Sequence, residues 1–125
     1  MFPGKPREEL EKLLEDLKTK VPQINASAIV SIEGLPIASE LPENIDEMRI
    51  AAMTAAMLSM GENASTTLEK GTLQEIIVSG KDGYVVTLAA GPNAVLTVNA
   101  QKKGVQLGLL YHFMKRIADQ ISQEL

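Results

Sequence analysis

One uninterrupted stretch, residues 45–70, constrains the fold of this chain more than any other part of the sequence. It contains no proline and one glycine, and it is rich in Ala, Met, Leu and Glu, which lose little conformational freedom in a helix. The stretch therefore predicts one α-helix of about 39 Å, at about 1.5 Å per residue. We expect Asn44 to be its N-cap, Asp46 and Glu47 to complement the positive end of the helix dipole, and Lys70 to end it.

The surface of this predicted helix is unusual, because Thr54 is the only residue between Ile50 and Leu58 that is not apolar. A helix that is apolar all round must be covered all round, either by its own domain core or by another polypeptide. The stripe expected to pack on a sheet is Ile50, Met53, Met57, Gly61, Ala64 and Leu68. The residues left without an evident partner are Ala51, Ala52, Ala55, Ala56, Leu58 and Met60. Because 125 residues rarely enclose a central helix, we favour a second polypeptide.

Composition limits the class of protein to which the chain can belong. Its 125 residues predict a single domain, residues 1–125, and the lack of Cys excludes disulfides and Cys-ligated metals. A net charge of -4 argues against general nucleic-acid binding. No apolar run approaches the ~18 residues of a membrane span, and the amino terminus does not resemble a signal peptide. We therefore expect a cytoplasmic protein without a transmembrane segment.

Helices and strands alternate along the rest of the chain. We expect helices over residues 6–20 and 104–123, and strands over residues 26–32, 35–39, 73–79, 83–89 and 94–99. Pro36 suits an edge strand, because proline cannot donate to a neighbouring strand. Ile76, Val86 and their alternating neighbours are expected on one face of the sheet, with Ile77 and Val85 on the other. Both faces are thus apolar, and helices are needed on each.

Few residues suggest chemistry. His112 lies between Tyr111 and Phe113 in an amphipathic helix, where a packing role is favoured over a catalytic one. Arg49 could stabilise phosphoryl-transfer charge, but we favour an exposed first-turn arginine paired with Asp46 or Glu47. The glycine-rich loops lack the pattern of a phosphate site. The lysines and arginine that could form a small basic corner are Lys102, Lys103, Lys115 and Arg116. We predict no catalytic residue, cofactor or metal site.

With these elements in place, the sequence resembles the roadblock/dynein light chain family, and within it the small prokaryotic MglB-like members. The likeness extends over residues 10–121, nearly the entire chain. The segments that carry it are residues 29–39, the Ala/Met-rich residues 51–62, and Glu75-Ile76-Ile77-Val78 followed by Gly80 and Gly83-Tyr84. No one of these segments is a sharp signature, and the assignment depends on their combination with the order of the elements.

The resemblance implies an α+β fold, with a five-stranded antiparallel sheet in the order 2-1-5-4-3. It places the long helix on one face and the first and last helices on the other. It also implies a homodimer in which strand 73–79 pairs with its twin and the two long helices lie side by side. That strand has no Pro, no Lys and one charge, so it lacks the usual protection of a free edge. The dimer-interface residues expected are Ala51, Ala55, Leu58, Leu73, Glu75 and Ile77.

Family members of this kind bind small Ras-like GTPases, as activating proteins or docking platforms, or belong to motor and signalling assemblies. The matching partner surface in this sequence is Ala52, Ala56, Ser59, Met60 and Asn63. The alternative function is a structural scaffold with no effect on nucleotide turnover. A small-molecule sensor is a third possibility, since a helix and a sheet can hold a ligand between them; the many small residues favour dense packing instead.

Overall fold

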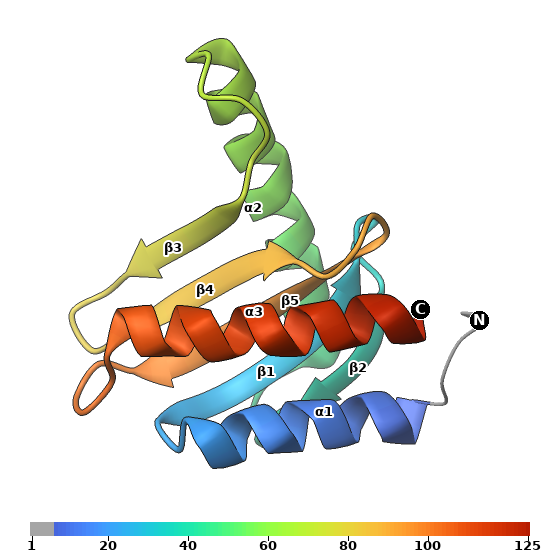
Figure 1. Ribbon diagram of the computed structural model, residues 1–125, viewed down its shortest axis with the longest axis vertical. Helices are drawn as coiled ribbons and strands as arrows, with labels where there is room; N and C mark the ends of the chain where they lie inside the picture. Colours follow the sequence, from blue (N-terminus) through green and yellow to red (C-terminus); the bar gives the residue numbers. More distant parts are fainter. Residues whose placement is uncertain (1–6) are drawn as a thin grey trace.

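Two helices, α1 and α3, lie side by side on one face of a sheet, and the long helix α2 crosses the other face (Figure 1). The computed structural model describes residues 7–125, and these contain the expected three helices and five strands. The elements are α1 (Arg7–Lys20), β1 (Ile24–Ser31), β2 (Pro36–Glu40), α2 (Glu47–Thr67), β3 (Glu75–Ser79), β4 (Gly83–Ala89), β5 (Ala94–Gln101) and α3 (Leu107–Glu124). The expected helix start at Pro6 lies outside the described residues.

The sheet is antiparallel throughout and has the order β2-β1-β5-β4-β3, as expected. Alternation along β1 sends Ile29 toward α1 and α3 and Val30 toward α2. One expectation about the faces is wrong. Ile77 pairs with Val86 and therefore shares its face, whereas Ile76 pairs with Thr87 on the face that α2 covers. A strand's alternation is visible in its sequence, but its register against the neighbour is not.

The main core lies between the sheet and the pair α1 and α3. Leu10, Leu14 and Leu17 follow the spacing of one helical stripe, and each is almost completely buried. From α3, Leu110, Met114 and Ile121 meet them over the same face of the sheet. Burying a large aliphatic side chain contributes about 1.5–3 kcal/mol, so this layer supplies most of the stability.

The long helix is shorter than expected at both ends. It begins at Glu47, and its N-cap is Asp46 rather than Asn44, with the Asp46 carboxylate accepting a hydrogen bond of 3.0 Å from the Met48 amide. The cause is a preceding turn, in which the Ile45 amide donates to the Pro42 carbonyl. At the other end, the helix ends at Thr67, and Leu68 is its C-cap, with the Leu68 amide donating to the Ala64 carbonyl at 3.0 Å. The length is therefore 21 residues, or about 32 Å.

The orientation of α2 on the sheet also differs from the expectation. Ala51 and Thr54 are its two buried residues, and Ala51 packs with Ala28, Val30 and Val95. By contrast, Met53 and Leu68 of the expected stripe are 48% and 66% exposed. Small residues face the sheet because they let the helix backbone approach it closely; Ala55 Cβ, for example, lies 3.1 Å from where a Cβ on Gly34 would stand.

Candidate interaction surface

Helix α2 presents one side to the sheet and an exposed outer side to solvent. The side toward the sheet carries Ala51 and Thr54 and, further along, Gly61. A methyl group added at Gly61 would lie 3.1 Å from side-chain atoms of both Leu73 and Ile76, so helix and strand approach closely there. The residues of the outer side are all exposed: Ala52, Ala56, Ser59, Met60 and Asn63. These are the five residues expected to bind a partner, and we call them the outer face.

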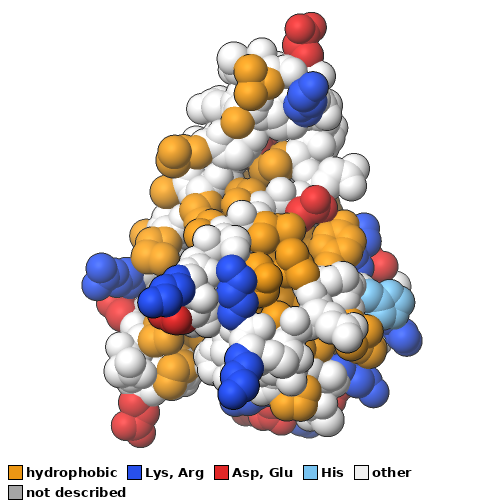
Figure 2. All heavy atoms as spheres, turned by 90° about the vertical axis from the view of Figure 1, so that its left-hand side faces the viewer, with side chains coloured by type: hydrophobic (Ala, Val, Ile, Leu, Met, Phe, Trp, Pro, Cys, Tyr) orange, Lys and Arg blue, Asp and Glu red, His pale blue; other side chains and the backbone are white. Residues whose placement is uncertain are grey.

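Hydrophobic side chains gather along one side of the molecule, from α2 in its upper part to the middle of the molecule (Figure 2). The large hydrophobic residues of α2, its C-cap and β3 that are most exposed are Met48, Met53, Met60, Leu68, Ile77 and Val78. An apolar surface extending over neighbouring elements is typical of an interaction site. This side therefore offers a partner both a helix and the open edge of a sheet.

The residues expected at a dimer interface fall into three groups. Ala51 is fully buried in its own chain, so the expectation that it lacks an intramolecular partner is wrong, and it has no surface to offer a second copy. Ala55, Leu58, Leu73 and Glu75 line one groove of about 460 Å³ between α2 and the start of β3. Ile77 is 44% exposed on β3. Leu73 precedes β3, which begins at Glu75.

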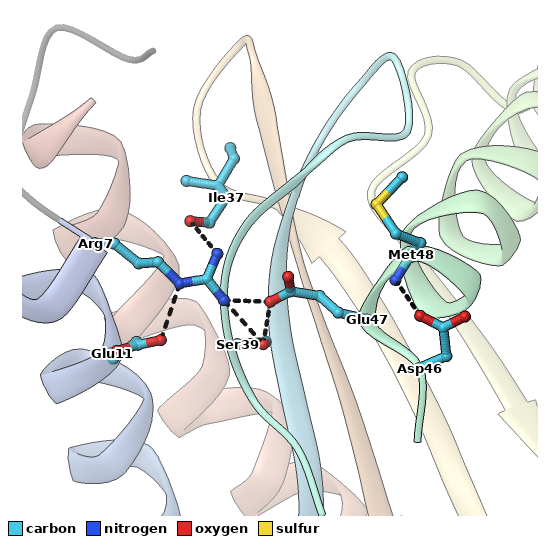
Figure 3. A network of polar contacts seen from close by, with 7 residues as sticks. All are labelled: Arg7, Glu11, Ile37, Ser39, Asp46, Glu47 and Met48. Carbon is cyan, nitrogen blue, oxygen red and sulfur yellow. Dashed lines mark hydrogen bonds and ion pairs between the residues drawn. The ribbon is translucent and has the colours of Figure 1, made fainter. Parts of the chain in front are cut away.

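The two edges of the sheet differ in how they are protected. At the β2 edge, Arg7 of α1 reaches Glu47 of α2, and both Arg7 and Ser39 donate hydrogen bonds to the Glu47 carboxylate (Figure 3). The same guanidinium donates to the Ile37 carbonyl at 3.4 Å and to Glu11 at 3.1 Å. This cluster joins the helix layers on the two faces of the sheet across the edge strand. Strand β3 forms the other edge and has β4 as its neighbour in the sheet.

The same cluster shifts two pKa values. The hydrogen bond to Glu47 raises the pKa of Arg7 above its ordinary value. Partial burial on its own would raise the pKa of the Glu47 carboxyl, but the hydrogen bonds from Ser39 and Arg7 outweigh it, and the pKa of Glu47 is lowered. At the β3 edge, a hydrogen bond to the Glu75 carboxylate raises the pKa of the Tyr111 phenol.

A smaller cavity of about 140 Å³ lies on the other flank of α2 from the groove. Helix residues at its wall include Ile50, Met53 and Met57, and the sheet contributes Ala26 and Val85. It is smaller than the roughly 300–1,000 Å³ typical of small-molecule sites. This size does not suit a small-molecule site in the cavity itself, whereas the groove of about 460 Å³ between α2 and β3 lies within that range.

The family described as Roadblock/LC7 domain matches residues 10–100. The chain belongs to the Roadblock/LC7 family. An uncharacterized protein of Methanocaldococcus jannaschii is 32% identical over 112 residues, covering 90% of this chain and 96% of that protein.

Two solved structures show the same fold as this Roadblock/LC7 domain. Myxococcus xanthus MglB superposes with a TM-score of 0.87 at 17% identity, covering 98% of this chain and 92% of that one. A structure described as MglB with tetrameric arrangement has a TM-score of 0.87 at 18% identity, with the same coverage of both chains. At these identities the likeness concerns the fold. It confirms the α+β architecture that the sequence predicted.

The sequence singled out a few residues of this Roadblock/LC7 domain for possible chemistry, and the structure shows what surrounds each of them. His112 is exposed, and its ring stands edge-on to Phe113 with 5.3 Å between centroids. Lys102 donates to Ser79 and to the Gly80 carbonyl, so it fastens the β3–β4 turn rather than forming a free basic corner. Arg49 is exposed as expected, but the carboxylate of Glu47 is bound by Arg7.

Two further observations concern metals and membranes. Residues 7–125 contain no group of three or more His, Cys, Asp or Glu side chains placed to bind a metal ion. None of the helices in this range combines the length and apolar character that crossing a membrane requires.

Proposed function

We propose that this protein is a homodimeric adaptor or regulator of a small Ras-like GTPase, acting by contact and without an active site of its own. The observation that carries the proposal is the outer face of α2, a regular helix surface that the other described residues, within 7–125, leave uncovered. Family membership supports the class of partner, because the family resemblance implies GTPase-binding dimers. Location in the cytoplasm is part of the same proposal.

The chemistry of the outer face suits a protein partner. Ala52, Ala56 and Ser59 are small, so a partner can approach the helix backbone closely over two turns. Met60 is 72% exposed and flexible, and methionine adapts to partner surfaces of different shape. Asn63 adds a hydrogen-bonding group at the end of the patch. Such a surface can hold another protein by shape and contact, which is how we propose that it acts on a GTPase.

The open β3 edge supports a homodimer. Its strand carries Ile77 and Val78, which are 44% and 45% exposed, and an exposed apolar edge strand favours pairing with another chain. A two-fold axis would let the same strand of a second copy pair with it. We propose that this pairing joins two sheets into one and sets the two α2 helices side by side.

The proposal is tested by Ala56→Arg, which places a long charged side chain in the middle of the outer face. We expect the variant to fold and dimerise normally and to lose binding of a small Ras-like GTPase encoded nearby, as measured by calorimetry. Gln120→Arg adds the same charge at an exposed position of α3 and is the matched control. Binding by Ala56→Arg at wild-type affinity would contradict the proposal.

A hydrolysis assay divides regulators from scaffolds. A regulator changes the rate of nucleotide hydrolysis by the GTPase, and Ala56→Arg should abolish that change. A structural scaffold binds and leaves the rate unaltered. The absence of any GTPase binding, together with stable incorporation into a larger assembly, would favour the scaffold.

A further inference from the structure

A groove of about 460 Å³ lies beside the outer face, between α2 and β3, and we call it the α2–β3 groove. Ala55, Leu58, Ser59 and Glu62 are related by spacings of three and four residues, so they form one wall along the helix. The ends of β4 and β5 form the floor. The wall from Ala55 to Glu62 is about 10 Å long, a distance that about three residues of extended chain also span.

The end of the groove at the β1–β2 turn is apolar. Gly34 in this turn lies against Ala55, so Ile32 of the same turn stands at the Ala55 end of the wall. The β4–β5 turn lies beside it, because the Ile32 amide donates to the Asn93 carbonyl at 3.2 Å, and Pro92 of that turn also lines the groove (Figure 1). Ile32 is 49% exposed and Pro92 is exposed. Both therefore offer apolar surface to an occupant.

The end of the groove near β3 is polar. Gly61 lies against Leu73, so the neighbouring Glu62 stands beside the segment that leads into β3. Glu62 and Gln74 line this end and are exposed. Within residues 7–125, neither side chain makes a hydrogen bond or an ion pair. Both groups are therefore free to bind an occupant.

The charge of the groove is negative. Among the described residues that line it, the charged ones are Glu62 and Glu75, and none is Lys, Arg or His. Glu75 pairs with Leu88, whose side chain lies in the core under α1 and α3, so the Glu75 side chain points to that face as well. The Glu62 carboxylate is therefore the charge that an occupant of the groove meets.

We propose that the α2–β3 groove binds an extended segment of a partner protein in which an apolar residue and an arginine or lysine stand two positions apart. The apolar side chain packs between Ile32 and Leu58, and the cation pairs with Glu62. In an extended chain, side chains two positions apart point to the same face and are separated by about 6.6 Å. That separation places one side chain at each end of a groove about 10 Å long.

A protein segment is the occupant because the groove and the outer face share a wall. Ser59 belongs to both, so a protein that covers the outer face has its own chain at the border of the groove. The inference thus rests on the proposed function for the source of the segment, and it adds what that partner must carry. The unpaired carboxylate selects a basic segment over an acidic one, since charge complementarity determines the choice of partner.

The probe for this site is the peptide acetyl-Gly-Leu-Ser-Arg-Gly-amide, and a matched peptide carries Glu in place of Arg. Each is titrated into the full-length protein and followed by amide chemical shifts. We expect the Arg peptide to shift amides around the groove, including Leu58, Gln74 and Ala89, with a dissociation constant of about 1 mM, as befits so short a contact. The Glu peptide should bind at least about threefold more weakly, because it meets a like charge. Shifts with neither peptide, or equal affinity for both, would overturn the proposal.

Two variants test the two ends of the groove separately. Glu62→Arg should reverse the preference, so that the Glu peptide binds about threefold more tightly than the Arg peptide. Ala89→Trp places an indole on the floor from an exposed strand position, and it should weaken the Arg peptide at least about tenfold by occupying the site of the apolar side chain. Gln120→Trp, at an exposed position of α3, is the matched control and should bind like wild type. An unchanged preference in Glu62→Arg would contradict the role of this carboxylate.

Ala56→Arg separates this inference from the proposed function. Ala56 lies on the outer face and does not line the groove, so this variant should lose the GTPase and still bind the Arg peptide as wild type does. A GTPase that binds Ala89→Trp as tightly as wild type would overturn the inference and leave the proposed function intact. Peptide binding without any GTPase binding would overturn the proposed function and leave the groove as a docking site.

Discussion

The two faces of the sheet are packed with side chains of different size. The face under α1 and α3 buries large groups, among them Leu14, Leu17 and Met114. The face under α2 buries chiefly Ala28, Val30, Ala51 and Val95, with the three threonines Thr54, Thr87 and Thr97. Both sets are almost fully buried, yet they remove very different amounts of apolar surface from water.

This difference suggests that one layer stabilises the domain and the other presents a surface to a partner. Free energy from apolar burial scales with area, so the layer of α1 and α3 holds the domain together. The α2 layer contributes less free energy from apolar burial, and most of its helix is left exposed to a partner. A helix bound to its own sheet mainly through Ala51 and Thr54 can present its methionines outward. The following predictions test this division.

The largest expected effect comes from the layer of α1 and α3, which buries the larger side chains. Leu14→Ala should lower the free energy of unfolding by about 2–5 kcal/mol, because it leaves a cavity at a fully buried position. Leu58→Ala, on the half-buried side of α2, should cost less than half as much. Urea denaturation of both variants at one protein concentration measures the difference. Equal losses would show that the two layers contribute alike.

An intermediate effect is expected in the layer between α2 and the sheet. The hydroxyls of Thr87 and Thr97 lie 2.8 Å apart and are hydrogen-bonded to each other in a buried site. Thr87→Val should cost about 1–3 kcal/mol, because it leaves the Thr97 hydroxyl buried without its partner. Adding Thr97→Val removes the second polar group and should recover much of that loss. Thermal unfolding of the single and double variants checks this, and a double variant that loses the sum of both effects would contradict it.

The smallest effect concerns the contact that ties the two layers together. Because the pKa of Glu47 is lowered in the folded protein, its stabilisation is present above the carboxyl's ordinary pKa near 4.5 and is lost as pH falls through the lowered value. Arg7 and Glu47 are partly exposed, so we expect about 1 kcal/mol or less. Melting temperatures of wild type and Glu47→Gln should differ at pH 7 and converge in acid. A difference that persists at pH 2 would assign the effect to something other than charge.

Much of the fold could be predicted from the sequence, because alternation and helical spacing are strong signals where one side is polar. The stripe Leu10, Leu14 and Leu17 has charged residues around it, and this contrast marks the side that is buried. Helix α2 gave no such contrast, since apolar residues surround it. The sequence therefore favoured the bulky stripe through Met53, whereas close packing selected the small Ala51.

The site was predicted unevenly for similar reasons. The outer face followed from the surplus of apolar surface together with the family resemblance, and its residues are exposed as expected. The Arg7 cluster was missed, because Arg7 and Glu47 are 40 positions apart and no local pattern links them. Asn44 and Asp46 are equally good N-cap residues by type, and only the turn that begins at Pro42 decides between them.

The Arg7 cluster also has a consequence for how far the protein can polymerise. Pro36 opens the edge strand without an amide hydrogen, and Arg7 engages the Ile37 carbonyl, so this border offers little to an incoming strand. Only the β3 edge of each sheet is therefore open to another strand, so two sheets can join there but neither can be extended at its β2 edge. Strand addition that begins at β3 therefore terminates itself at a pair of chains and cannot grow into a fibre.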